Sequence, residues 1–171
     1  SAEQAAAHND ADVMFAQMMI PHHSQAIEMS DMLLAKENIP AEVIALAEQI
    51  KAAQGPEIEQ LESWLDQWGA PMATSEDGHD MPGMDEGTGM GTSGMDGMMS
   101  AEDMQALAQA QGTDAARLFL DQMIVHHEGA VEMAQTEIGE GRFTDAVVMA
   151  RSIVDTQQQE IETMRQLLET L

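Results

Sequence analysis

Residues 15–29 read FAQMMIPHHSQAIEM, and residues 119–133 read FLDQMIVHHEGAVEM. At a constant offset of 104 residues, several positions of the first stretch recur in the second. The recurring residues are Phe15, Met19, His22, His23, Ala26, Glu28 and Met29, which correspond to Phe119, Met123, His126, His127, Ala130, Glu132 and Met133. A repeat at a fixed offset indicates an internal duplication, and it guides the interpretation of the rest of the chain.

The paired histidines occupy different positions around a helix. At about 100° per residue, His22 and His126 each lie in the middle of an apolar stripe, with apolar residues one and two turns away. His23 and His127 lie about 100° to one side, on the flank of that stripe. We therefore expect His22 and His126 to face the interior, and His23 to form a more exposed pair with Met19.

The whole chain, residues 1–171, is expected to form one domain. Its expected segments are a first helical hairpin over 10–69, a flexible Met- and Gly-rich linker over 72–99, a short helix over 100–112 and a second hairpin over 113–171. The hairpins also repeat in their second halves, because QGPEI at 54–58 corresponds to QQQEI at 157–161. Two hairpins that each expose an apolar face predict an all-α four-helix bundle.

Helix boundaries are marked by capping residues and prolines. The expected N-terminal caps are Asn9 or Asp10, Ser100 together with Asp103, and Thr113 or Asp114. Pro21 lies inside the first helix, and Gly55-Pro56 lies inside the second. Because proline removes a backbone donor, we expect a kink at Pro21 and a kink or a split at Pro56.

The composition excludes several classes of function. The chain carries a formal charge of −25, which repels nucleic acids and anionic lipid but attracts cations. It has 17 methionines and no cysteine, which suits an oxidising compartment. It lacks an apolar run of the roughly 20 residues that a membrane span needs. We therefore expect an extracytoplasmic protein, periplasmic, secreted or anchored at the surface, whose N-terminal targeting segment has been removed.

The repeated stretches carry ligands that suit a soft metal ion. Imidazole and thioether groups favour copper, and thioethers favour the monovalent ion over zinc or iron. Met18, His22 and Met29 are spaced so that all three can point into one seam of the bundle. Two alternatives remain open. The histidines can be buried structural groups of a metal-free scaffold, or the bundle can be a di-iron enzyme, although no Glu-x-x-His motif occurs at either histidine pair.

The segments Met18 to Met29, His79 to Met84 and Phe119 to Met133 resemble those of the domain of unknown function 305 family. The resemblance extends from about residue 12 to residue 168. It implies a ferritin-like four-helix bundle that is exported from the cytoplasm, and some members are similar to copper-binding proteins of copper tolerance. The two copies of the motif differ at Gln122, which stands where the first copy has Met18.

These observations predict a non-enzymatic protein that sequesters or transfers Cu(I), and by similar softness Ag(I). Its expected partners are the metal ion and another copper protein, with no nucleic acid. The candidate ligands in the repeated stretches are Met18, Met19, His22, His23, Met29, Met123, His126, His127 and Met133. The candidate ligands in the linker are His79, Met81 and Met84.

Overall fold

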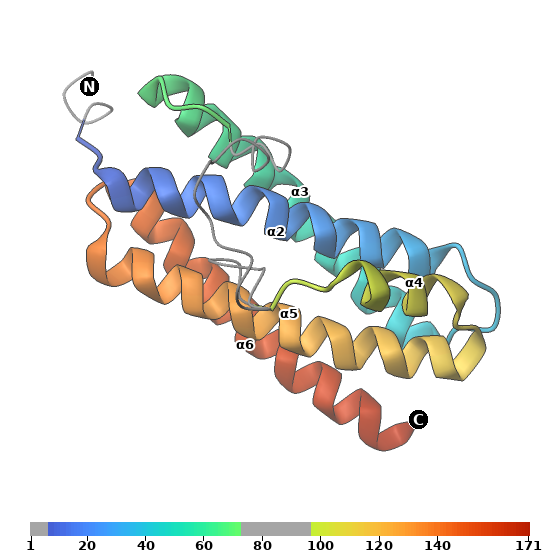
Figure 1. Ribbon diagram of the computed structural model, residues 1–171. Coiled ribbons are helices and arrows are strands. Elements are labelled where there is room, and N and C mark those ends of the chain that lie inside the picture. Colours follow the sequence, from blue (N-terminus) through green and yellow to red (C-terminus); the bar gives the residue numbers. More distant parts are fainter. Residues whose placement is uncertain (1–6, 73–96) are drawn as a thin grey trace, which may run out of the picture.

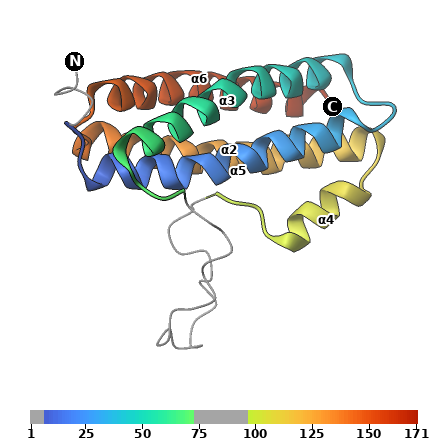
Figure 2. The ribbon, with the colours of Figure 1, turned by 90° about the horizontal axis from the view of Figure 1, so that it is seen from above.

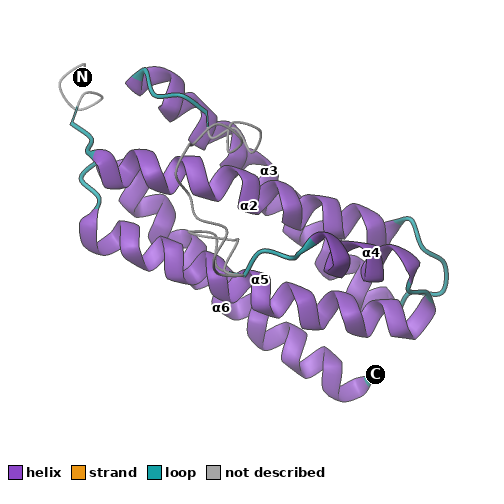
Figure 3. Cartoon of the chain, viewed as in Figure 1, coloured by secondary structure: helices purple, strands orange, loops and turns teal. Residues whose placement is uncertain are grey.

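The computed structural model describes residues 7–72 and 97–171 (Figure 1). The described residues form helices and no strand, as the sequence predicts (Figure 3). The helices are α2 (Asp10–Leu34), α3 (Ala41–Trp68), α4 (Ala101–Gln109), α5 (Gly112–Glu140) and α6 (Thr144–Thr170). The linker expected over 72–99 lies for the most part outside the described residues.

The four long helices form a bundle. Helix α2 packs against α3, and α5 packs against α6. The two pairs meet where α2 lies beside α5. Figure 2 shows α3 and α6 on one side of α2 and α5, and the short helix α4 on the other side. The two repeated stretches therefore lie next to each other in the centre of the bundle.

Helix starts agree with the sequence at two caps and differ at a third. Asn9 caps α2 and Ser100 caps α4, each through a capping box with the aspartate three residues later. Helix α5 was expected to begin after Thr113 or Asp114, but it begins at Gly112 with Gln111 as its N-cap. Gly112 has a φ of 58°, which glycine adopts without strain, so the chain turns directly from α4 into α5.

Neither proline divides its helix. Helix α2 continues through Pro21 and α3 continues through Pro56, so the split considered for the second helix does not occur. Pro56 is exposed and Pro21 is half-buried, and neither belongs to the buried core. Side-chain packing along the rest of each helix compensates for the one backbone hydrogen bond that each proline removes.

Two glutamines of α2 hold the chain on either side of residues 73–96. Gln17 Nε2 donates a hydrogen bond to the Pro71 carbonyl oxygen at 2.8 Å. Gln25 Nε2 donates to the Met99 carbonyl oxygen at 3.0 Å, and Gln25 Oε1 accepts from the Met99 N–H at 2.8 Å. Gly97 has a φ of 80° and lies against α5, where a Cβ atom would clash with the backbone. Both ends of this segment are thus attached to the central helices.

Asp12 connects the start of α2 to the turn between α5 and α6. Its carboxylate is fully buried and accepts hydrogen bonds from three backbone N–H groups. The donors are Asn9 at 2.8 Å, Arg142 at 3.1 Å and Phe143 at 3.0 Å. The Asn9 side chain adds a bond to the Glu140 carbonyl oxygen at 2.9 Å. These bonds fix the ends of α2 and α5 relative to each other, and hence the register of the two repeated stretches.

Asp12→Ala is expected to lower the free energy of unfolding by about 2–3 kcal/mol, because buried N–H donors lose a charged acceptor. Asp10→Ala is the matched control, since Asp10 is exposed in the same helical turn and contributes less than about 1 kcal/mol through the helix dipole. Urea denaturation monitored by circular dichroism measures both changes. Equal losses in the two variants would contradict this role of Asp12.

Candidate metal centre

A polar layer crosses the middle of the bundle and divides the apolar core. One apolar cluster includes Leu33, Ile50 and Phe119, and the other includes Phe15 and Leu61. Between them, each long helix contributes two polar side chains, which together we call the histidine layer. Its members are His22 and His23 of α2, Gln54 and Glu57 of α3, His126 and His127 of α5, and Gln157 and Glu160 of α6.

The rings of His22 and His126 contact each other at the centre of this layer. Their ring centroids are 3.8 Å apart, and the ring planes are inclined by 34°. The pKa of His126 is lowered well below 6.5, mainly by burial and then by the neighbouring His22, His127 and His23. His126 is therefore a neutral imidazole, and neither of its ring nitrogens has a hydrogen-bond partner. A neutral, unpartnered imidazole nitrogen is the form of histidine that binds a metal ion.

His23 and His127 each pair with a glutamate from a neighbouring helix. His23 Nε2 lies 3.0 Å from Glu57 Oε1, and His127 Nε2 lies 2.7 Å from Glu160 Oε1. Both histidines are fully buried, so the expectation that His23 and Met19 form a more exposed pair is wrong. The flank of α2 is buried because α3 covers it, which the angular positions within one helix do not reveal.

The two glutamates and the two glutamines were not among the candidate site residues. Gln54 and Gln157 are buried, and their Oε1 atoms have no hydrogen-bond partner. The signal that could have identified all four was visible in the sequence, because they are the residues shared by QGPEI and QQQEI. They recur at an offset of 103 residues, close to the 104 of the histidine pairs, which indicates that both sets belong to the same duplication.

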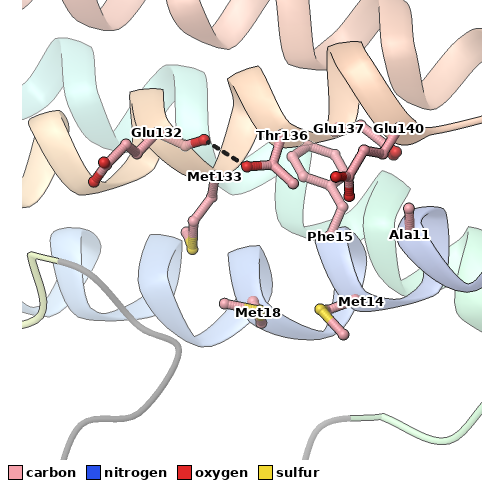
Figure 4. A pocket seen from close by; sticks show the side chains of 9 residues that line it. All are labelled: Ala11, Met14, Phe15, Met18, Glu132, Met133, Thr136, Glu137 and Glu140. Carbon is pink, nitrogen blue, oxygen red and sulfur yellow. Dashed lines mark hydrogen bonds between the residues drawn. The ribbon is translucent and has the colours of Figure 1, made fainter. Parts of the chain in front are cut away.

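A groove of about 280 Å³ lies between α2 and α5, on the side of the layer toward Asp12. Three methionines line it, and we call it the thioether groove. Figure 4 shows Met133 of α5 pointing toward α2, where Met14 and Met18 lie. Met14, which is 58% exposed, was also missed as a candidate. The other lining residues are Ala11, Phe15, Glu132, Thr136, Glu137 and Glu140.

The groove brings together only two of the methionines that the sequence singled out, Met18 and Met133. Met19, Met29 and Met123 are fully buried in the apolar clusters. At the place corresponding to Met18 in the second stretch, Gln122 donates a hydrogen bond to the Asp103 carbonyl oxygen and so holds α4. The linker candidates His79, Met81 and Met84 lie outside the described residues.

Histidine, aspartate and glutamate alone do not form a ready metal site within residues 7–72 and 97–171, where no three of them converge. Zinc and di-iron centres need three or more converging ligands.

Glu137 closes the end of the thioether groove beside Asp12. Its pKa is raised from 4.5 to about 8, mainly by burial and then by the hydrogen bond and the negative charge of Asp12. The protonated carboxyl group of Glu137 can donate to Asp12 without adding a second buried charge. A Cβ atom at position 141 would overlap this carboxyl group, which explains the glycine there.

Comparison with known proteins identifies the class to which this bundle belongs. The profile of the family described as Domain of unknown function (DUF305) matches residues 12–168. The chain therefore belongs to the DUF305 family. A comparison with proteins of curated function finds no significant sequence match. No helix of the described residues is long and apolar enough to cross a membrane.

Several solved structures resemble the chain over nearly its whole length. A DUF305 fragment from Deinococcus radiodurans is 30% identical with a TM-score of 0.80, covering 96% of this chain and 99% of that one. A candidate secreted DUF305 protein from Streptomyces coelicolor is 30% identical with a TM-score of 0.78, covering 94% and 91%. CopM in its Cu(I)-bound form is 30% identical with a TM-score of 0.72, covering 93% and 96%. CopM has also been solved with Cu(II), with silver and without metal.

Glu137→Gln is expected to remove a pH dependence of stability. The pKa of Glu137 is about 8 in the folded chain and near 4.5 in the unfolded chain. The proton on Glu137 therefore stabilises the fold fully below pH 4.5, and this stabilisation is lost as the pH rises to about 8. The wild-type free energy of unfolding should fall across that window, and the variant's should fall less. Urea denaturation at several pH values measures this, with the exposed Glu132→Gln as control. Parallel curves for wild type and Glu137→Gln would contradict the assignment.

Proposed function

We propose that this protein binds monovalent copper, and also silver, through its histidine and methionine side chains. The observation that carries the proposal is the histidine layer, in which both ring nitrogens of His126 and the Nδ1 atoms of His23 and His127 are buried without a hydrogen-bond partner. An unpartnered buried acceptor costs free energy unless a ligand uses it. The similarity to CopM, which has been solved with Cu(I), Cu(II) and silver, supports the choice of metal.

The thioether groove supplies the second part of the proposal. Met14, Met18 and Met133 line a groove that is open to solvent, whereas the histidine layer is buried. Thioethers need no deprotonation to bind a soft ion and prefer the monovalent state of copper. The strongly negative charge of the chain raises the local concentration of cations around the groove. The groove thus receives the ion, and the histidine layer holds it.

The wider assignments belong to the same proposal. The protein acts outside the cytoplasm without catalysing a reaction, and it sequesters copper or passes it to another copper protein. The absence of cysteine and the similarity to a candidate secreted protein support an oxidising location. The fold is a ferritin-like bundle built from two related hairpins. The recurrence of the His-His and Gln-x-x-Glu motifs supports the relation between the hairpins.

Replacing His126 tests whether the layer binds metal. His126→Leu removes two unpartnered nitrogens from the core, so the free energy of unfolding should stay equal or rise. The affinity for Cu(I) should fall by at least about tenfold. Loss of a group that only hydrogen-bonds to a metal ligand already lowers metal affinity by about 10–100-fold, and loss of the ligand itself should lower it at least as much. Anaerobic titration against a competing chelator measures the affinity.

His8→Leu is the matched control for His126→Leu, because His8 stacks on Trp68 at the end of the bundle, 4.7 Å between ring centroids, away from the layer. Unchanged copper affinity in His126→Leu would make the histidines structural groups of a metal-free scaffold. Iron bound to the purified chain, with oxygen-dependent turnover, would instead favour a di-iron enzyme.

The double variant Met18→Leu and Met133→Leu tests the thioether groove. Leucine keeps the volume and the apolar character of methionine, so stability should change by less than about 1.5 kcal/mol. The number of Cu(I) ions bound in an anaerobic titration should fall. The controls are Met104→Leu and Met149→Leu, which replace half-buried methionines outside the groove. If the control variants lost as many bound Cu(I) ions as the double variant, the groove would not be the site. The same conclusion would follow if the double variant bound as many ions as the wild type.

A further inference from the structure

Two carboxylates that the candidate ligand set did not contain contact the outer histidines of the layer. Glu57 of α3 faces His23, and Glu160 of α6 faces His127, each at the Nε2 atom. In both histidines the opposite nitrogen, Nδ1, is buried and has no hydrogen-bond partner. The same arrangement thus occurs twice, on two different pairs of helices.

The distances determine which nitrogen carries the proton. At 2.7 Å from a carboxylate oxygen, Nε2 of His127 must be a donor, because two acceptors at that distance would repel each other. The same holds for His23 at 3.0 Å. A proton on Nδ1 as well would leave a buried N–H without an acceptor, which typically costs about 1–3 kcal/mol. The favoured state of each ring is therefore Nε2–H, with the lone pair on Nδ1.

We infer that Glu57 and Glu160 are positioning residues that hold His23 and His127 in the Nε2–H tautomer, so that Nδ1 of each ring is the atom offered to the metal ion. This inference rests on the proposed function, and it deepens it by naming the ligand atoms and their supporting groups. A histidine that binds metal through one nitrogen commonly donates from the other to a carboxylate, which fixes the ring and raises its basicity.

The four histidines lie in one layer of the bundle. His22 and His126 are 3.8 Å apart between ring centroids, and His23 and His127 are their neighbours in sequence. The two carboxylates also put negative charge beside the buried site, and this charge compensates part of the cost of desolvating a cation. Glu160 is 3% exposed, so its charge is poorly screened by water, whereas Glu57 is 22% exposed.

The two glutamates differ in how firmly they are held. Glu160 Oε2 accepts a second hydrogen bond from Gln49 Nε2 at 3.0 Å, and Oε1 faces His127. In Glu160→Gln, the amide oxygen can still accept from His127 Nε2, because the exposed Gln49 can turn its own amide to match. Glu160→Ala removes the acceptor, so the His127 ring should exchange between its two tautomers.

Glu57 serves as the internal comparison. Within the described residues, His23 is the side chain that the Glu57 carboxylate contacts, so the amide of Glu57→Gln can turn its oxygen toward His23 and keep the Nε2–H tautomer. Both conservative changes should therefore keep the tautomer of the histidine that they face. Glu57→Ala removes the acceptor altogether and should leave His23 exchanging between its two tautomers.

The experiment measures tautomer and affinity separately. Two-bond ¹H–¹⁵N correlation spectra of the metal-free, full-length chain report which ring nitrogen carries the proton. The wild type should show Nε2–H for His23 and His127, and Glu160→Ala should show both tautomers for His127 alone. Anaerobic Cu(I) titration should then give about 10–100-fold weaker binding for Glu160→Ala and a small change for Glu160→Gln. Glu162→Ala, which replaces an exposed glutamate on the same helix, is the matched control.

Each outcome decides a different question. Nδ1–H or doubly protonated rings in the wild type would overturn the inference, whatever the metal affinity. The expected tautomers with unchanged copper affinity in Glu160→Ala would also overturn it, while leaving copper binding by the chain intact. A wild-type chain that binds no copper would overturn the proposed function together with the ligand assignment, and the spectra would then report a purely structural pairing.

Discussion

Burial of a polar layer in the middle of an apolar core is the constraint on which the arrangement of this bundle depends. Each of the four long helices must place its two polar side chains at the same level, because an unmatched histidine or glutamate in the core costs far more than a mispacked leucine. The pairs His23 with Glu57 and His127 with Glu160 satisfy part of this requirement across the helices of each hairpin. The layer therefore selects the register of the helices, which apolar packing alone would leave less well defined.

The constraint also explains the positions of the other polar contacts. Asp12 fixes the end of α2 against the turn that follows α5, and one consequence is that Met14 and Met18 lie opposite Met133. The thioether groove thus lies between a buried carboxylate pair at the end of the bundle and the histidine layer at its centre. The polar groups follow the seam between α2 and α5, which is the contact that joins the two hairpins.

Sequence reasoning predicted the helices and the central position of His22 and His126, because both follow from the period of a single helix. It did not predict the burial of His23, since that depends on how α3 lies across the flank of α2. The recurrence of Glu57 and Glu160 was visible in the sequence, but their contacts with the histidines were not. A repeated motif does not reveal which neighbouring helix its side chains contact. Met14 was missed for a related reason. It lies outside the repeated stretch, and only the packing of α5 places it beside Met133.

The hydrogen bonds of Gln17 to Pro71 and of Gln25 to Met99 have a consequence for the course of the chain. Because both ends of the intervening segment are attached to the same helix, its closure is fixed by the bundle and not by its own sequence. The two attachment points lie eight residues apart on one helix, which corresponds to about 12 Å of rise. The helices around the histidine layer therefore determine where the chain leaves the bundle at Pro71 and where it returns at Met99.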